Sequence, residues 1–290
     1  MIVNPQSGLK KGLEILKQVI PIFEKHGVQL TILETEKVGH AYEYAYELDY
    51  KGYDGLCAIG GDGTMHEIIN GMLKRSDNMK LPIGLVTGGT GNSFMHDLNC
   101  LDPITASKRI VEGRLRDIDI AEIDSNGRVM YGFNIVGWGM PTDITILAEK
   151  LRWLGTQRYN VSAIIEVMKY KQRLAKVIIE GNTVVGDFGF VLGCNTIHTG
   201  RGMKMAPLAD LNDGMIDLII VRKASRLKLL RLFPKLFSGN HISDPIVEYR
   251  QVREFSVIPV EDGLLSIDGE IIGDTPIHVQ MIENAVKILV

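Results

Sequence analysis

The residues whose types and spacing most clearly suggest chemistry are Gly60-Gly61-Asp62-Gly63-Thr64, which follow the apolar residues 56–59 and precede a helix-like pattern. Glycines in such a turn let backbone N–H groups approach phosphate oxygens, and the following helix presents its N-terminal N–H groups to the same anion. Asp62 would repel a phosphate unless it accepts a proton from an attacking hydroxyl or acts through Mg²⁺. The pattern favours phosphoryl transfer, and a plain strand–helix turn with a capping Asp is the alternative.

A second glycine-rich turn, Gly88-Gly89-Thr90-Gly91-Asn92, follows the apolar residues 82–86. The carboxyl ends of parallel strands meet at one edge of a sheet, so two such turns on neighbouring strands would form one nucleotide crevice. The chain has neither a GxxxxGK[ST] loop nor a strand-linked GxGxxG followed by a ribose-binding acid. The expected crevice therefore belongs to neither of these two common nucleotide-binding classes.

The elements that must position these turns alternate between strand-like and helix-like segments up to residue 117. Continuous apolar strands among helices predict a parallel sheet that is covered on both faces. Pro21 is expected to kink or break the first helix. The helix-like patterns lie at residues 13–23, 41–48 and 65–73.

Beyond residue 117 the pattern changes to hairpin-like strands, beginning around the turn at residues 124–127. Two helical stretches, roughly residues 145–154 and 226–237, interrupt the later strands. We therefore predict an α/β nucleotide-binding domain with a parallel sheet over residues 1–117. A mainly antiparallel β-sandwich domain is predicted over residues 118–290.

The composition is that of an ordinary globular protein, with 290 residues, 45% hydrophobic content and a net charge of −3. This charge gives no reason to expect nucleic acid binding. No stretch approaches the roughly 20 apolar residues that span a bilayer. Three widely spaced cysteines favour a reducing, cytoplasmic location. The sequence is compatible with a homodimer and does not fix the oligomeric state.

The extended segment Gly60-Gly61-Asp62-Gly63-Thr64-Met65-His66-Glu67-Ile68-Ile69-Asn70-Gly71-Met72 resembles the signature of the diacylglycerol kinase catalytic-domain family, which includes bacterial lipid kinases, sphingosine kinases and ceramide kinases. Four other segments resemble further motifs of that family in the same order. The resemblance implies a lipid-binding second domain and ATP- and Mg²⁺-dependent phosphorylation of a lipid hydroxyl. The other segments are Asn4-Pro5 with Ser7-Gly8, Thr35-Glu36 with His40-Ala41, Pro82 to Asn92, and Ser266-Ile267-Asp268-Gly269-Glu270.

By the same resemblance, Asp62 is the base or the Mg²⁺-linked carboxylate that engages the lipid hydroxyl. Glu270 would act near the metal and the nucleotide, and Glu67 would orient the phosphate loop; an ordinary helix-surface carboxylate is the alternative for Glu67. The nucleotide-binding residues that the resemblance implies in the first domain are Asn4, Thr35, Gly61, Gly63, Thr64, Glu67, Thr90 and Asn92.

Residues 137–159 resemble the sphingosine and ceramide kinase branch of the family. Arg152 and Arg158 match arginines that contact ATP phosphates there, a role that suits guanidinium groups; solvated helix charges are the alternative. Sphingosine kinases carry two acidic residues here, the second of which recognises the sphingoid head group. This chain has Asp143 and then Thr145. Either Asp143 serves the substrate alone or the lipid is uncharged.

Asp210-Leu211-Asn212-Asp213-Gly214-Met215 resembles the structural Mg²⁺ loop of bacterial diacylglycerol kinase-like enzymes. By that resemblance, the side chains of Asp210 and Asp213 and a backbone carbonyl, assigned to Met215, bind the ion. A plain Asp-Gly turn is the alternative. Because the chain combines features of both branches, the substrate stays open between a sphingosine-like base and diacylglycerol.

Residues 222–237 are basic and apolar together, which predicts an amphipathic helix on an anionic membrane surface. Packing on the sandwich with a solvated basic edge is the alternative. Trp138 and Trp153 are candidates for an acyl pocket or for the core. The rival functions are an NAD kinase-like small-molecule kinase and a non-catalytic lipid-binding protein of the same fold.

Overall fold

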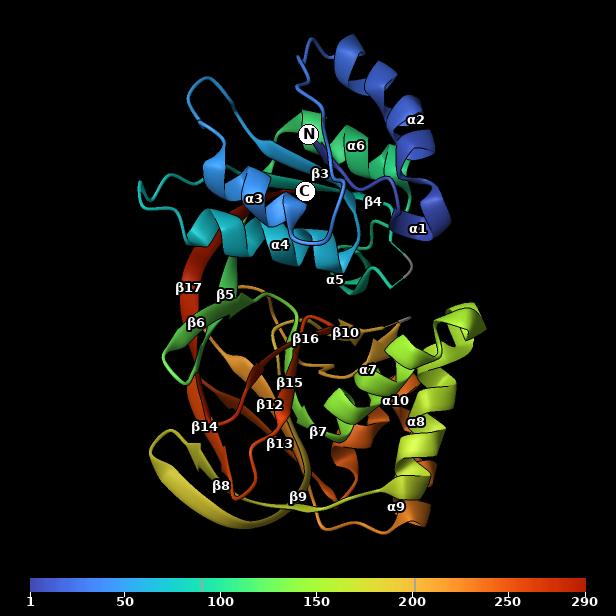
Figure 1. Ribbon diagram of the computed structural model, residues 1–290, viewed down its shortest axis with the longest axis vertical. Helices are drawn as coiled ribbons and strands as arrows, with labels where there is room; N and C mark the ends of the chain where they lie inside the picture. The colour runs from blue at the N-terminus through green and yellow to red at the C-terminus, as the bar shows by residue number, and fades with distance from the viewer. Residues whose placement is uncertain (90, 201) are drawn as a thin grey trace. The chain divides into compact units, whose positions relative to one another are not determined.

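The computed structural model describes residues 1–89, 91–200 and 202–290, and of Leu9, Arg152 and Thr156 it describes the backbone alone. The chain divides into two compact units (Figure 1). Unit 1 comprises Met1–Asp119 and Glu283–Val290, and unit 2 comprises Ile120–Ile282. The predicted fold class, an α/β domain with a parallel sheet followed by an antiparallel β-sandwich, is confirmed.

The sheet of unit 1 is parallel and has the strand order β17–β4–β3–β1–β2. Every residue of β3 and β4 is buried, as expected for apolar strands covered on both faces. Ile59 of β3 lies between Val3 of β1 and Val86 of β4. The strands are β1 (Ile2–Val3), β2 (Leu33–Glu34), β3 (Leu56–Gly60), β4 (Ile83–Thr87) and the end of β17 (Ile277–Leu289).

Helices flank this sheet, and their apolar side chains complete its core. Val19 and Phe23 pack with Ile59 and Ile110 in one buried cluster. The predicted break at Pro21 is wrong, because helix α2 runs through it. Pro21 is exposed, where water can replace the lost hydrogen bond, while buried neighbours hold the helix in place. The helices are α1 (Ser7–Lys10), α2 (Gly12–Lys25), α3 (His40–Glu47), α4 (Asp62–Leu73), α5 (Ser93–Asp97) and α6 (Pro103–Glu112).

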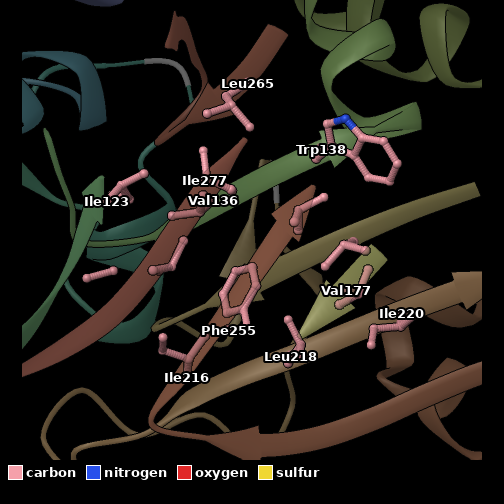
Figure 2. Packing of buried hydrophobic residues seen from close by; sticks show 14 of the residues in the cluster. Ile123, Val136, Trp138, Val177, Ile216, Leu218, Ile220, Phe255, Leu265 and Ile277 are labelled. Atoms are coloured by element: carbon pink, nitrogen blue, oxygen red, sulfur yellow. The ribbon is translucent and has the colours of Figure 1, made fainter. Parts of the chain in front are cut away.

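Unit 2 is built from antiparallel strands, in the order β16–β15–β7–β9–β8–β14–β17, with β12 pairing both β9 and β13. Alternate side chains of these strands form one apolar core that includes Trp138, Phe255 and Leu218 (Figure 2). The strands are β5 (Leu115–Ser125), β6 (Arg128–Gly132), β7 (Ile135–Gly139), β8 (Arg173–Ile179), β9 (Asn182–Cys194), β10 (His198–Thr199), β11 (Met203–Lys204), β12 (Ile216–Arg222), β13 (Val247–Val252), β14 (Glu254–Pro259), β15 (Leu264–Ile267) and β16 (Glu270–Asp274).

The helical part of unit 2 is larger than predicted. Instead of one helix over residues 145–154, α7 (Met140–Lys150) and the 3₁₀ helix η1 (Arg152–Gln157) are followed by α8 (Arg158–Lys169). Helix α8 escaped prediction because its buried face uses Ser162 and Ala163 beside Val167, which weakens the apolar periodicity. The predicted helix at residues 226–237 divides into α9 (Arg226–Leu232) and α10 (Lys235–Ser238), followed by the 3₁₀ helix η2 (Asn240–Ser243).

The division of the chain differs from the prediction at both ends. The chain passes from unit 1 to unit 2 after Asp119, within β5, and its last eight residues belong again to unit 1. There Ile288 pairs with Ile83 of β4 and covers an edge that would otherwise expose unpaired backbone groups. A strand that joins a sheet from so far along the chain leaves no local pattern, so the sequence boundary at residue 117 missed it.

Candidate functional site

The two glycine turns lie at the carboxyl ends of the adjacent parallel strands β3 and β4. The Gly88 N–H donates to the carbonyl of Gly60 at 2.7 Å. A Cβ on Gly61 would lie 2.9 Å from the Cα of Gly89, and a Cβ on Gly89 would lie 2.6 Å from the Cα of Gly61. Only residues without side chains allow this approach. The turns therefore form one backbone cradle, as predicted from their positions after two strands.

Asp62 is the first residue of α4, and backbone groups of the second turn region hold its carboxylate. The Ser93 N–H donates to Oδ2 at 2.8 Å, and the Phe94 N–H donates to Oδ1 at 3.3 Å. Gly61 is the N-cap of α4 and Gly63 is its second residue, so this helix starts within the cradle. The N-terminus of α4 is suited to an anion, and the two amide bonds fix the direction of the carboxylate beside it.

Three polar residues from separate segments lie at the same edge of the sheet. Asn4 follows β1, and its Nδ2 donates to Oγ1 of Thr64 at 3.4 Å. Thr35 follows β2, and its N–H donates to the carbonyl of Val3 at 2.9 Å. The structure therefore brings the two early motifs to the strand ends that also carry the glycine turns.

Asn92 adopts the left-handed backbone conformation with φ 51°, and its Nδ2 donates to the carbonyl of Gly89 at 2.9 Å. Its Oδ1 is buried and has no hydrogen-bond partner among the residues that the structure describes. This oxygen would lie 3.5 Å from a Cβ on Gly61, so it faces the cradle. The neighbouring Thr90, also predicted to bind the nucleotide, lies outside the described residues.

Glu67 binds backbone groups of another helix. Its Oε1 accepts from the Gly39 N–H at 2.9 Å and its Oε2 accepts from the Ala41 N–H at 3.0 Å. Gly39 is the N-cap of α3, so Glu67 stabilises the start of that helix. The loop that Glu67 orients is the one between β2 and α3, which also contains Thr35. This role differs from the predicted one, in which Glu67 orients the glycine turn.

In unit 2, Glu270 is exposed at the start of β16. The hairpin that carries it is anchored by Asp268, a residue of the same motif to which sequence reasoning gave no role. Oδ1 of Asp268 accepts from the Asn134 N–H at 2.8 Å and the Ile135 N–H at 3.0 Å, and Oδ2 accepts from the Phe133 N–H at 3.2 Å. The sequence signal for this turn was an Asp directly before a Gly. Asp tolerates the left-handed backbone conformation, with a φ of 53°, that Asp268 adopts here.

Arg158, predicted to bind ATP phosphates, is engaged within unit 2. Its Nη1 lies 3.2 Å from Oε1 of Glu149, and its Nη2 donates to the Tyr159 hydroxyl at 3.4 Å. Burial raises the pKa of Tyr159, and the negative charges of Glu149 and Glu270 add to this rise. Arg158 and Glu270 thus share a neighbour in Tyr159. The side chain of Arg152 lies outside the part of the chain that the structure describes.

Asp143, the predicted substrate carboxylate, is paired with an arginine that the sequence did not single out. Nη2 of Arg173 donates to Oδ1 at 2.8 Å and to Oδ2 at 2.7 Å. Thr145, at the second of the two acidic positions, donates to the carbonyl of Pro141 at 3.0 Å. The charge of Asp143 is therefore balanced within the protein. The sequence offered no signal for Arg173, because it lies on β8, far from Asp143 along the chain.

In the loop at residues 210–215, two aspartate side chains accept hydrogen bonds from backbone N–H groups of the same loop. Oδ1 of Asp213 accepts from the Met215 N–H at 3.0 Å, and Oδ1 of Asp210 accepts from the Asn212 N–H at 3.4 Å. Burial raises the pKa of nearby Asp217 to about 6, and the charges of Asp213 and Asp210 add to the rise. No three His, Cys, Asp or Glu side chains of the described residues form a metal site. The predicted cation site, with Asp210, Asp213 and the Met215 carbonyl as ligands, therefore stays a prediction.

Both parts of the chain resemble known protein families. Residues 1–123 match the diacylglycerol kinase catalytic domain, and residues 134–290 match the YegS C-terminal NAD kinase beta sandwich-like domain. A diacylglycerol kinase of Bacillus subtilis is 31% identical over 95% of this chain and 90% of its own length. Sphingosine kinase 2 of Arabidopsis thaliana is 30% identical over 94% of this chain and 68% of its own.

A solved diacylglycerol kinase structure from Bacillus anthracis has a TM-score of 0.75 at 18% identity, covering 99% of this chain and 94% of that one, which shows the shared fold. The two family matches and the Bacillus subtilis relative establish that the chain belongs to the lipid kinase family defined by the diacylglycerol kinase catalytic domain.

Replacing Asp268 by Ala is expected to lower the free energy of unfolding by about 2–4 kcal/mol, because two buried backbone N–H groups and one partly buried one lose their acceptor. Chemical denaturation measures this loss. The matched control is Asp274→Ala, an exposed carboxylate on the same hairpin, which should leave stability nearly unchanged. Equal stability of the two variants would contradict the anchoring role of Asp268.

Proposed function

We propose that this chain is an ATP-dependent kinase that transfers the γ-phosphoryl group to a lipid hydroxyl. The observation that carries the proposal is the position of Asp62, whose carboxylate is held by the Ser93 and Phe94 N–H groups beside two glycine turns in contact. A carboxylate in a phosphate cradle serves no purpose in anion binding alone. It suits a site where a hydroxyl must lose its proton as it attacks phosphorus.

In the proposed reaction, backbone N–H groups of the cradle and of the first turn of α4 bind the phosphates. Asp62 accepts the proton of the lipid hydroxyl. The hydroxyl oxygen then bonds to the γ-phosphorus, while the bond between the γ-phosphorus and the ADP oxygen breaks. Mg²⁺, when bound with the nucleotide, supplies positive charge to the phosphate oxygens. We assign Asn4, Thr35, Thr64 and Asn92 to the nucleotide because they lie at the edge of the sheet that carries the cradle.

The assignments in unit 2 form a second part of the proposal. Glu270 is proposed as the second acidic residue of the reaction, since it is exposed on a hairpin that Asp268 holds rigidly. Arg158, with Arg152, is proposed to contact nucleotide phosphates, and binding would require Arg158 to exchange its bond to Glu149 for one to phosphate. Asp143 is proposed to face the lipid head group.

We further propose that unit 2 contacts the surface of an anionic membrane from the cytoplasmic side. Leu229 and Leu232 of α9 are buried in unit 2, while Leu227 of the same helix is 57% exposed. Trp153 is 78% exposed, so neither core packing nor an acyl pocket accounts for it. Exposed apolar side chains beside basic ones suit the interface of an anionic bilayer. The exposed basic residues of α9 and α10 are Arg226, Lys228, Arg231 and Lys235.

A membrane contact of this kind is peripheral. No helix of residues 1–89, 91–200 and 202–290 is both long and apolar enough to cross a bilayer. The three cysteines are buried and unpaired, which supports a reducing compartment. Burial raises the pKa of Cys57 to about 11, so this thiol is a small buried hydrophobe rather than a nucleophile.

Two other functions were open from the sequence. An NAD kinase-like activity is favoured by one observation, the likeness of residues 134–290 to a sandwich of NAD kinase type. A non-catalytic lipid-binding role is disfavoured because Asp62, Thr64, Asn92 and Glu270 are all retained. A labelled-ATP assay with sphingosine, ceramide, diacylglycerol, monoacylglycerol and NAD separates the three functions.

We expect Asp62→Asn to lower the rate of lipid phosphorylation by about two to four orders of magnitude, because the positioned base is lost. Transfer of labelled phosphate to lipid in mixed micelles measures the rate, and the thermal melt of each variant verifies folding. Asp54→Asn, an exposed carboxylate of unit 1, is the control and should retain the wild-type rate. Wild-type turnover by Asp62→Asn would refute the proposed mechanism.

For the loop at residues 210–215, we expect Mg²⁺ to raise the melting temperature of the wild-type protein without nucleotide. A ligand at 100 times its Kd stabilises the folded state by about 2.7 kcal/mol. Asp213→Asn should abolish this shift, since it removes a charged ligand, whereas Asp187→Asn, at an exposed position of β9, should retain it. Equal shifts in both variants would show that the loop is a plain turn.

For the membrane surface, we expect the double replacement of Lys228 and Arg231 by Glu to weaken binding to phosphatidylserine vesicles by at least about tenfold. Each basic residue near an anionic bilayer contributes about 1 kcal/mol. Sedimentation with vesicles measures binding, and Lys176→Glu, at an exposed position of β8, is the control. If the double variant and the control bind alike, α9 is not part of the membrane contact.

A further inference from the structure

The pair of Asp143 and Arg173 is the feature of unit 2 that carries an inference about the substrate. Asp143 lies in the first turn of α7, and Arg173 is the first residue of β8. A single nitrogen, Nη2, donates to both carboxylate oxygens, at 2.8 Å and 2.7 Å. The two side chains are 28% and 27% exposed, so the pair is held in a partly buried place that a ligand can still reach.

The second terminal nitrogen of Arg173, Nη1, takes no part in the pair with Asp143. Nη1 of Arg173 is buried and has no hydrogen-bond acceptor within the described part of the protein. A buried N–H without an acceptor is unfavourable, and most such groups in folded proteins are paired. Nη1 therefore offers a donor to a ligand that brings an acceptor oxygen and displaces no existing bond.

The surroundings of the pair connect it to the proposed reaction. Helix α7 packs against β15 and β16, and β16 begins with Glu270. Oγ1 of Thr145, two residues after Asp143, lies 3.5 Å from Oγ of Ser266 on β15, and both residues are buried. A lipid head group at α7 would therefore lie against the strands that carry the late acidic motif.

A cationic head group and a neutral one interact differently with this pair. An ammonium group brought to Asp143 would lie beside a guanidinium of the same charge, and both carboxylate oxygens already accept from that guanidinium. The ammonium could bind well only by breaking the ion pair. An uncharged acylglycerol meets no like charge, and its ester carbonyl oxygens are acceptors for Nη1.

We propose that Arg173 is a specificity-determining residue that selects an uncharged acylglycerol of the diacylglycerol class and rejects a cationic sphingoid base. The inference rests on the proposed function, since it concerns the acceptor of the same kinase reaction. Arg173 acts in two ways: its paired nitrogen neutralises Asp143, and its unpaired nitrogen binds an ester carbonyl oxygen.

The test compares kcat/KM for diacylglycerol and for sphingosine, presented in the same mixed micelles, in the wild-type protein and four variants. The wild type should prefer diacylglycerol by at least about tenfold, as expected where a like charge must be approached. Arg173→Gln should reduce this preference by at least about tenfold, because Asp143 becomes available to an ammonium. Adding Asp143→Asn to Arg173→Gln should abolish the gain in sphingosine turnover.

Arg173→Lys separates the two roles of the arginine. Lysine keeps the positive charge beside Asp143 but lacks the second nitrogen, so sphingosine should stay excluded while KM for diacylglycerol rises and kcat is retained. If Arg173 served stability alone, the replacement would not raise KM while leaving kcat unchanged. Arg128→Gln, an exposed arginine on β6, is the control and should match the wild type on both lipids.

The inference is overturned if the wild type phosphorylates sphingosine as well as diacylglycerol, or if Arg173→Gln and Arg173→Lys both keep the wild-type ratio. Failure of the proposed function looks different, because then the wild type phosphorylates none of the four lipids of the labelled-ATP assay. That result would overturn both proposals together.

Discussion

The close approach of two backbone turns is the constraint on which the candidate site depends. Gly61 and Gly89 lie so near each other that a Cβ on either would clash with the backbone of the other. The hydrogen bond between Gly88 and Gly60 ties the same two strand ends together. This contact determines where α4 begins and so where Asp62 lies. It also brings the start of α5 within hydrogen-bonding distance of the Asp62 carboxylate.

Acidic side chains in both units follow a common pattern, in which each binds backbone N–H groups of a neighbouring element of its own unit. Asp62 binds the start of α5, Glu67 binds the start of α3, and Asp268 binds the turn before β7. Each carboxylate joins segments that are distant in sequence. Carboxylates bind N–H groups through charge-assisted hydrogen bonds, which are stronger and more directional than neutral ones. Each of these loops is thereby fixed without large apolar side chains.

Charge pairing distinguishes unit 2 from what its sequence suggested. From the sequence, Arg158 was expected to be a cation available to phosphate, and Asp143 an anion available to the amine of a lipid head group. In the structure each has a partner of opposite charge, Glu149 and Arg173 respectively. Such pairs are partly buried, so they restrict which ligands can compete for either member. Spacing along a helix cannot reveal them when, as for Arg173, the partner comes from a distant strand.

Much of the fold and the unit 1 site was predictable because the signals are local. Apolar strands ending in glycine turns predicted the parallel sheet and the cradle, and the order of motifs predicted the family. Helix α8 was missed because small residues form its buried face, and Pro21 misled because its exposed position tolerates a lost hydrogen bond. The return of Glu283–Val290 to unit 1 left no local trace.

By itself, the sequence determined the class of chemistry, because residue types at short spacing set what a turn can bind. The tertiary structure alone decided which charges are balanced and which polar atoms lack partners, as Asp143 and Arg173 show. The physical reason is range. Hydrogen bonds and ion pairs act over a few ångströms in space, whatever the separation along the chain.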